Sequence, residues 1–108
     1  MLRDGELVLG PFQGLPACNR IALGEGVCGS AVSTGEIQLI PDVHLFPGHI
    51  ACDSASNSEL VIPIIKKNKV LGVLDLDSPL KERFSSLHIE YFSQLVDTLN
   101  EYIDWDRI

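Results

Sequence analysis

The chain has 108 residues, of which 45% are hydrophobic and 21% charged, so it has the length and composition of one globular domain, residues 1–108. Fifteen acidic residues against eight basic ones give a formal net charge of −7, and the lysines and arginines are scattered along the sequence. This balance disfavours nucleic acid as a partner. No apolar run approaches the roughly 18 residues that span a bilayer, so we expect no membrane segment and a cytoplasmic location.

The first elements in chain order are short. Residues 6–9 predict a strand, which Gly-Pro ends. Small and apolar residues at 26–34 predict a short helix, closed by Gly35 as its C-cap and carrying Cys28 in its first turn. Residues 36–40 predict a further brief strand. The segment 42–58 has no sustained period, and a loop of that length inside a compact domain is usually functional or disordered. Its two histidines and one cysteine favour a functional loop.

The second half of the chain has the clearest pattern. Two β-rich runs, 60–65 and 70–76, are joined by a turn in which Asn68 accepts the left-handed conformation, so they predict a β-hairpin. Both runs are almost wholly apolar, which indicates a sheet covered on both faces. From about Ser86 an amphipathic helix is predicted, with Ser85 or Ser86 as its cap. Its apolar positions are Leu87, Tyr91, Phe92, Leu95, Val96, Leu99 and Ile103.

Three cysteines, Cys18, Cys28 and Cys52, are spaced by ten and twenty-four positions. An odd number at these spacings suits neither a disulfide scaffold nor the close cysteine pairs of a zinc site. Taken alone, each is most simply a small buried hydrophobe. A zinc site of His44, His49 and Cys52 is conceivable, but no short paired spacing supports it.

Acidic residues gather around the predicted hairpin. Asp75 and Asp77 are two apart, so on a strand both project from the face of Leu71 and Val73. The alternative, which the residues alone slightly favour, is that the strand has ended and both aspartates are solvated. With a regular two-residue turn, Glu59 would pair with residue 76 and lie on the opposite face.

A bulge would change this register. Pro63 lacks the N–H that a ladder requires, and one extra residue near it would bring Glu59 to the face of the two aspartates. We therefore predict such an irregularity if the three acids act together.

Four segments together closely resemble the free methionine-(R)-sulfoxide reductases, a family built on the GAF fold. They are ELVLGPFQGLPAC, GEGVCGSAVSTGE, DVHLFPGHIACDSASNSELVIPI and VLGVLDLDSP. The resemblance implies an α+β fold, with a central antiparallel sheet and helices on its faces. It also implies that the chain reduces the sulfoxide of the free amino acid, is recycled by thioredoxin, and needs no metal or other cofactor.

At the matching positions, the resemblance makes Cys52 the nucleophile and Cys18 its resolving partner, with Cys28 as a rival for the nucleophile. Glu59, Asp75 and Asp77 fall on the family's substrate-binding acids. In this chemistry a thiolate attacks the sulfoxide sulfur, methionine leaves, and a cysteine sulfenic acid remains. A second cysteine condenses with it to a disulfide, which an external dithiol reopens. A protonated acid donates to the sulfoxide oxygen, and ionised ones receive the substrate ammonium group.

The chain also departs from the family. Members carry a longer N-terminal part, so we expect N-terminal elements to be missing here and the strand at 6–9 to lack a neighbour. The chain is then a fragment of a longer product or one that associates, for example as a homodimer. Lys67-Asn68 replaces the family's more usual Asp-Gly turn. The alternative to an enzyme is a non-catalytic GAF module that binds a small molecule, or an inactive remnant.

Overall fold

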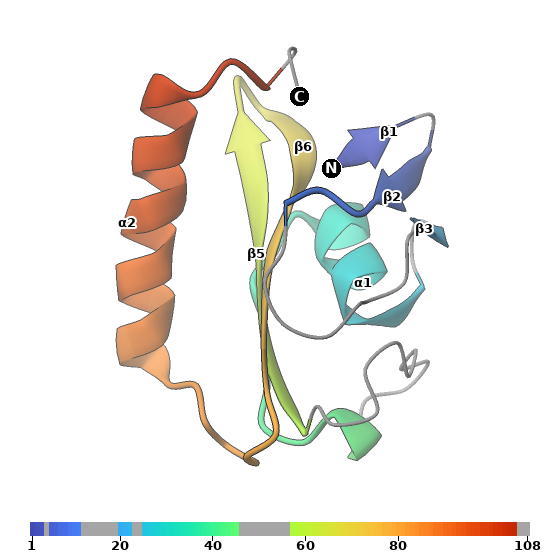
Figure 1. Ribbon diagram of the computed structural model, residues 1–108, viewed down its shortest axis with the longest axis vertical. Coiled ribbons are helices and arrows are strands. Elements are labelled where there is room, and N and C mark those ends of the chain that lie inside the picture. The colour runs from blue at the N-terminus through green and yellow to red at the C-terminus, as the bar shows by residue number, and fades with distance from the viewer. Residues whose placement is uncertain (4, 12–19, 23–24, 46–56, 106–108) are drawn as a thin grey trace.

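The computed structural model describes residues 1–3, 5–11, 20–22, 25–45 and 57–105. Their strands form two antiparallel sheets of three strands each, and two α-helices pack against the larger sheet. Figure 1 shows the β5–β6 hairpin of this sheet between the two helices, with the smaller sheet on the side of α1. The combination of antiparallel sheets and helices confirms the predicted α+β class.

The larger sheet has the strand order β4-β5-β6, with β4 at Gln38–Ile40, β5 at Ser58–Lys66 and β6 at Lys69–Ser78. β5 and β6 form the predicted hairpin and extend beyond the apolar runs at both ends. At the turn, Lys67 and Asn68 have φ angles of 54° and 62°. Positive φ at both central residues is what a two-residue hairpin turn of type I′ requires, so Lys67 shares the conformation that was predicted for Asn68 alone.

A register shift in this hairpin confirms the predicted irregularity but places it elsewhere. Ile65 pairs with Val70 and Ile64 with Gly72, so Leu71 is the extra residue and it lies on β6. Pro63 pairs regularly with Val73. The proline is tolerated because β4 pairs with β5 only over residues 59–61, which leaves the strand without a neighbour on that side at Pro63.

Helix α1, Gly26–Thr34, confirms the predicted short helix. Gly35 caps it in the left-handed conformation, at φ 69°, and its N–H donates to the carbonyl of Ala31 at 2.9 Å. Six of its nine residues are buried, because its small side chains let the backbone lie close to β5 and β6. Val27, Ala31 and Val61 belong to the core on this side of the sheet.

Helix α2, Ser86–Tyr102, covers the opposite face and begins after the N-cap Ser85, as predicted. Ile89, Phe92, Val96, Leu99 and Ile103 pack in the core on this side, together with Leu60, Ile62 and Trp105. The sheet is therefore covered on both faces. No helix of the described residues is long and apolar enough to cross a membrane.

The predicted apolar stripe of α2 is buried only in part. Leu87, Tyr91 and Leu95 are 71%, 65% and 39% exposed, so they lie on the side of the helix that faces away from the sheet. The predicted stripe combined residues from two neighbouring faces of the helix, one that packs on the sheet and one that is exposed. Residues on both faces recur at intervals of three or four, so periodicity alone does not separate them.

The smaller sheet contains β1 (Leu2–Arg3), β2 (Glu6–Val8) and β3 (Arg20–Ala22), with β2 in the middle. The expectation that the strand at 6–9 lacks a neighbour is wrong, since β2 pairs on both sides. Gly5, at φ 80°, allows the chain to turn back tightly between β1 and β2.

Candidate active site

The bulge at Leu71 decides which face of the hairpin carries the acids. Beyond it, Glu59 pairs with Asp77, and Asp75 pairs with Val61. Paired residues of an antiparallel ladder project to the same side, so all three carboxyl groups lie on the face that α1 covers. The alternative in which the strand ends before Asp75 is wrong, because β6 continues to Ser78. Leu71 itself packs on the α2 side, not beside Val73 as predicted, because the bulge interrupts the alternation.

Cys28 reaches the same place from the first turn of α1. Its thiol donates to Oε2 of Glu59 at 3.8 Å. The sulfur of Cys28 and one carboxylate oxygen each of Glu59 and Asp75 lie within 4.8 Å of one another. With Asp77 paired to Glu59 on the ladder, these four residues form one group, called here the acid–thiol cluster. Cys28 and Glu59 are buried, whereas Asp75 and Asp77 are exposed.

The surroundings of Glu59 keep it protonated at neutral pH. Burial is the first cause, followed by a hydrogen bond with Asp75 and the negative charges of Asp75 and Asp77. Together they raise the pKa of Glu59 from 4.5 to about 11. A neutral carboxyl group next to carboxylates is a proton donor available at physiological pH.

The same factors act on Cys28. Burial comes first among the causes, and the negative charge of Asp75 and a hydrogen bond with Asp75 add to it, so the pKa of its thiol is raised far above the ordinary value. A thiol must lose its proton to become a nucleophile. Burial and the aspartate beside it therefore favour the protonated form of Cys28.

Cys28 lines a small, mostly apolar cavity of about 80 Å³. Its walls include the side chains of Met1, Leu7, Leu9 and Val73. The acid–thiol cluster thus combines a proton donor, exposed carboxylates and an adjoining apolar space. These suit a small ligand that carries a cationic group, a basic oxygen and a short apolar part.

Cys18 and Cys52 lie outside the described residues, so their roles as resolving partner and nucleophile stay predictions. His49 lies outside them too. His44 is described, in the short 3₁₀-helix η1 (Val43–Leu45), and its Nε2 is 3.1 Å from Oδ1 of Asn57. The zinc site of His44, His49 and Cys52 therefore stays a prediction.

The acid–thiol cluster has a donor set that could hold a metal ion. One thiol and two carboxyl groups match the number of protein ligands in a catalytic zinc site. Binding would require Cys28 and Glu59 to lose their protons, and their raised pKa values oppose that loss in the metal-free protein. That the protein needs no metal stays a prediction.

Two polar residues that the sequence analysis did not single out hold the open end of the hairpin. The hydroxyl of the fully buried Ser58 donates to the carbonyl of Leu80 at 2.6 Å. The side-chain N–H of Asn57 donates to the carbonyl of Pro79, also at 2.6 Å. Both residues precede Glu59 directly, so these bonds position the end of β5 that carries it. Their signal in the sequence is a pair of polar residues placed just before an apolar strand.

The GAF domain model matches residues 2–104, and the chain belongs to the GAF domain family. Within it, the chain is 52% identical over 103 residues to the free methionine-R-sulfoxide reductase of Escherichia coli, covering 95% of this chain and 62% of that protein. It is 48% identical over 99 residues to the protein of the same name from Saccharomyces cerevisiae, and this match covers 91% of this chain and 55% of the yeast protein. These identities confirm the resemblance to the free methionine-(R)-sulfoxide reductases.

A solved structure agrees with these relatives. The X-ray structure of the Neisseria meningitidis free methionine-R-sulfoxide reductase in complex with its substrate superposes with a TM-score of 0.91 at 41% identity. The superposition covers 96% of this chain and 62% of the Neisseria chain. The chain thus has the predicted GAF-like fold, and it spans about three fifths of the length of the relatives it matches.

Proposed function

We propose that the protein reduces free L-methionine-(R)-sulfoxide to L-methionine. The observation that carries the proposal is the acid–thiol cluster, in which a protonated Glu59, a thiol and two exposed aspartates meet in one place. The names of the relatives supply the substrate, and the cluster supplies groups that suit it: carboxylates for the ammonium group, an acid for the sulfoxide oxygen and an apolar cavity for the thioether end.

In this proposal the acids divide the work by their protonation. Asp75 and Asp77 receive the substrate ammonium group, because exposed carboxylates attract a cation and gain charge-assisted hydrogen bonds from it. Glu59 gives its proton to the sulfoxide oxygen as the sulfur–oxygen bond breaks. The thiols supply the two electrons.

We assign the nucleophile to Cys52 and the resolving cysteine to Cys18. The raised pKa of the buried Cys28 supports this choice, since that thiol resists forming a thiolate. Attack by the Cys52 thiolate on sulfur transfers the sulfoxide oxygen to the cysteine, which leaves methionine and a sulfenic acid. The Cys18 thiol then displaces the hydroxyl as water and forms a disulfide.

Thioredoxin is the proposed reductant, because a disulfide inside one chain is reopened by an external dithiol. Cysteines that must return to the thiol form suit the reducing cytoplasm, which we propose as the location. We also propose that residues 1–108 act as one GAF domain and associate as a homodimer. The apolar side chains of Leu87, Tyr91 and Leu95 on the outer side of α2 support the association.

The second candidate function is a non-catalytic GAF module that binds a small molecule. One observation favours it: the chain spans only about three fifths of its enzymatic relatives. A module of this kind would use the same acid–thiol cluster to bind free methionine or its sulfoxide without turning it over.

A coupled assay distinguishes the two functions. Oxidation of NADPH by thioredoxin reductase and thioredoxin is followed after adding the protein and the R or S epimer of free methionine sulfoxide. We expect turnover with the R epimer alone, loss of turnover in Cys52→Ser, and retention of activity in Cys28→Ser. The matched Cys28 variant shows whether any loss is specific to the nucleophile.

Calorimetry completes the test. If the folded protein binds the R epimer without turning it over, the proposed function is the binding module and not the enzyme. Turnover that depends on Cys28 and not on Cys52 would reverse the assignment of the nucleophile while leaving the reaction in place.

A further inference from the structure

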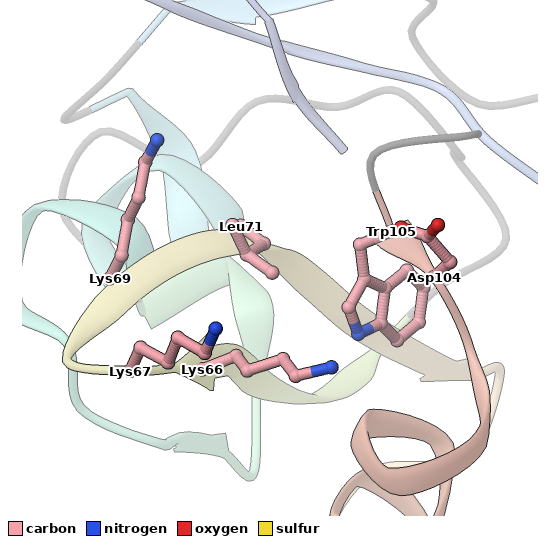
Figure 2. Close-up of a pocket in the computed structure, with 6 residues that line it drawn as sticks. All are labelled: Lys66, Lys67, Lys69, Leu71, Asp104 and Trp105. Atoms are coloured by element: carbon pink, nitrogen blue, oxygen red, sulfur yellow. The ribbon is translucent and has the colours of Figure 1, made fainter.

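A second hollow lies at the turn of the β5–β6 hairpin, at the opposite end of the ladder from Glu59 and Asp77. It has a volume of about 380 Å³, which falls in the range of small-molecule sites. Figure 2 shows its lining, which comprises Lys66, Lys67, Lys69, Leu71, Asp104 and Trp105. The proposed reaction uses none of these residues.

Positive charge is concentrated here in an otherwise acidic chain. Three of the eight basic residues of the sequence line the hollow, against one carboxylate, although the net charge of the chain is −7. Within the described part of the chain, none of the three ammonium groups has a carboxylate as an ion-pair partner. The basic residues look scattered in the sequence, but the fold gathers these three at one site.

The backbone makes this arrangement unfavourable without a ligand. Lys66 and Lys69 are partners on the ladder, so two lysines of like charge face each other across the hairpin backbone. Lys67 follows at a φ of 54°, a conformation that lysine rarely adopts and that glycine or asparagine adopts easily. Neutral residues suited to positive φ would avoid both the repulsion and the strain at this turn. A bound anion would remove the repulsion.

Beside the lysines and Asp104, the hollow has two apolar walls, Leu71 and Trp105. The indole N–H of Trp105 donates to Oδ1 of Asn100 at 2.9 Å, which holds the ring at the side of the hollow, and Leu71 lies across from the lysines. A neighbouring hollow of about 280 Å³ shares Lys69, Leu71 and Trp105 and is also lined by Arg3. The two hollows therefore share part of their lining, and the second is lined by one more cationic residue.

We propose that this hollow is a binding site for a compact multivalent anion of the diphosphate class. Lysine ammonium groups act as point charges on phosphate oxygens, and three of them can share the charge of a diphosphate. Free pyrophosphate and the diphosphate of an organic ester have the same anionic chemistry. The ester would in addition place its organic part against Leu71 and Trp105.

Trp105 provides a direct measurement, because it is the only tryptophan of the chain and lines the hollow. Its fluorescence is followed during titration with pyrophosphate at constant ionic strength, and heats of binding are measured in parallel. We expect saturable binding, weakened at least about tenfold in a Lys66→Gln, Lys67→Gln, Lys69→Gln variant. Higher salt should weaken the binding further, since exposed charges are screened.

The controls distinguish the site from general attraction to cations. A Lys81→Gln, Arg83→Gln variant removes exposed cations elsewhere and should bind pyrophosphate as the unmodified chain does. Circular dichroism confirms that both variants are folded. Tighter binding of an organic diphosphate ester than of pyrophosphate would assign the site to the ester, and equal binding would assign it to the inorganic anion. The absence of saturable heat, or equal binding by the triple-lysine variant, would overturn the proposal.

Discussion

At the scale of single residues, the acid–thiol cluster owes its properties to burial next to like charges. Glu59 and Cys28 are enclosed between α1 and the sheet, while Asp75 and Asp77 keep their exposure and act on them as fixed negative charges. Both buried groups therefore retain their protons. In the proposed reaction the carboxyl groups therefore divide into a proton donor and cation ligands, because their environments differ.

Glu59 should make the protein less stable as the pH rises. Its pKa is about 11 in the folded chain and near 4.5 in the unfolded chain, so between these values the folded state holds the extra proton. Stability that is present below about pH 4.5 is then lost progressively toward alkaline pH. Glu59→Gln removes this titration, and we expect a flatter dependence of the melting temperature on pH between about 5 and about 8. Glu90→Gln, on the exposed side of α2, should leave the slope unchanged. An unchanged slope in Glu59→Gln would show that Glu59 is ionised in the folded protein.

The proposed division of work among the acids predicts different kinetic defects. Glu59→Gln removes the proton donor and should lower kcat about a hundredfold or more with little change in KM. Asp75→Asn removes a ligand of the substrate ammonium and should raise KM about tenfold, the equivalent of one charge-assisted hydrogen bond. Steady-state kinetics over a range of substrate concentrations measures both. A rise in KM alone for Glu59→Gln would contradict its role as the acid.

At the scale of elements, the hairpin and its bulge position the site. With a regular ladder, Asp75 and Asp77 would project from the face opposite Glu59, and the extra residue Leu71 on β6 brings them to the α1 side, where Glu59 lies. Helix α1 then brings Cys28 within reach because its small residues allow a close approach to β5. The open end of the hairpin is held by the hydrogen bonds of Asn57 and Ser58.

The turn of this hairpin is less stable than it could be. Replacing Lys67-Asn68 by Asn-Gly places residues suited to positive φ at both central positions, so we expect the free energy of unfolding to rise by about 1 kcal/mol. Lys67→Gln is the matched control, because it removes the charge and keeps an ordinary side chain at a φ of 54°. Chemical denaturation measures all three proteins. A gain in Lys67→Gln equal to that of the double variant would attribute the effect to charge repulsion and not to backbone strain.

At the scale of the whole molecule, the two helices differ in how much of their surface is exposed. α1 is enclosed between the two sheets, whereas α2 covers one face of the larger sheet and exposes its own outer side. Leu87, Tyr91 and Leu95 follow each other at intervals of four on that side, so they form a continuous apolar strip. This strip is the surface that the proposed homodimer would bury.

Polar replacements on this strip should weaken association without loosening the fold. We expect Leu87→Gln with Tyr91→Gln to shift sedimentation toward the monomer while the melting temperature stays nearly unchanged, because both side chains are largely exposed. Glu101→Gln, an exposed position on the same helix, controls for the change in surface chemistry. A dimer that persists in the double variant would place the interface elsewhere.

The sequence by itself determined the local elements. Helix α1 with its glycine cap, the hairpin with its turn at 67–68 and helix α2 with its serine cap all follow from short-range patterns of side-chain size, periodicity and φ preference. The sequence also indicated the acids and Cys28 as site residues, through their spacing and their resemblance to a known family.

Only the tertiary structure decided how these residues meet. The bulge is at Leu71 and not near Pro63, because the location of an extra residue depends on packing on both faces of the sheet and not on the proline alone. The tertiary structure also decided that one strip of α2 is exposed and that three lysines gather at the turn. The spacing of these residues in the sequence is the same whether they are buried or exposed. The raised pKa values of Glu59 and Cys28 likewise come from desolvation and neighbouring charges that only the folded chain brings together.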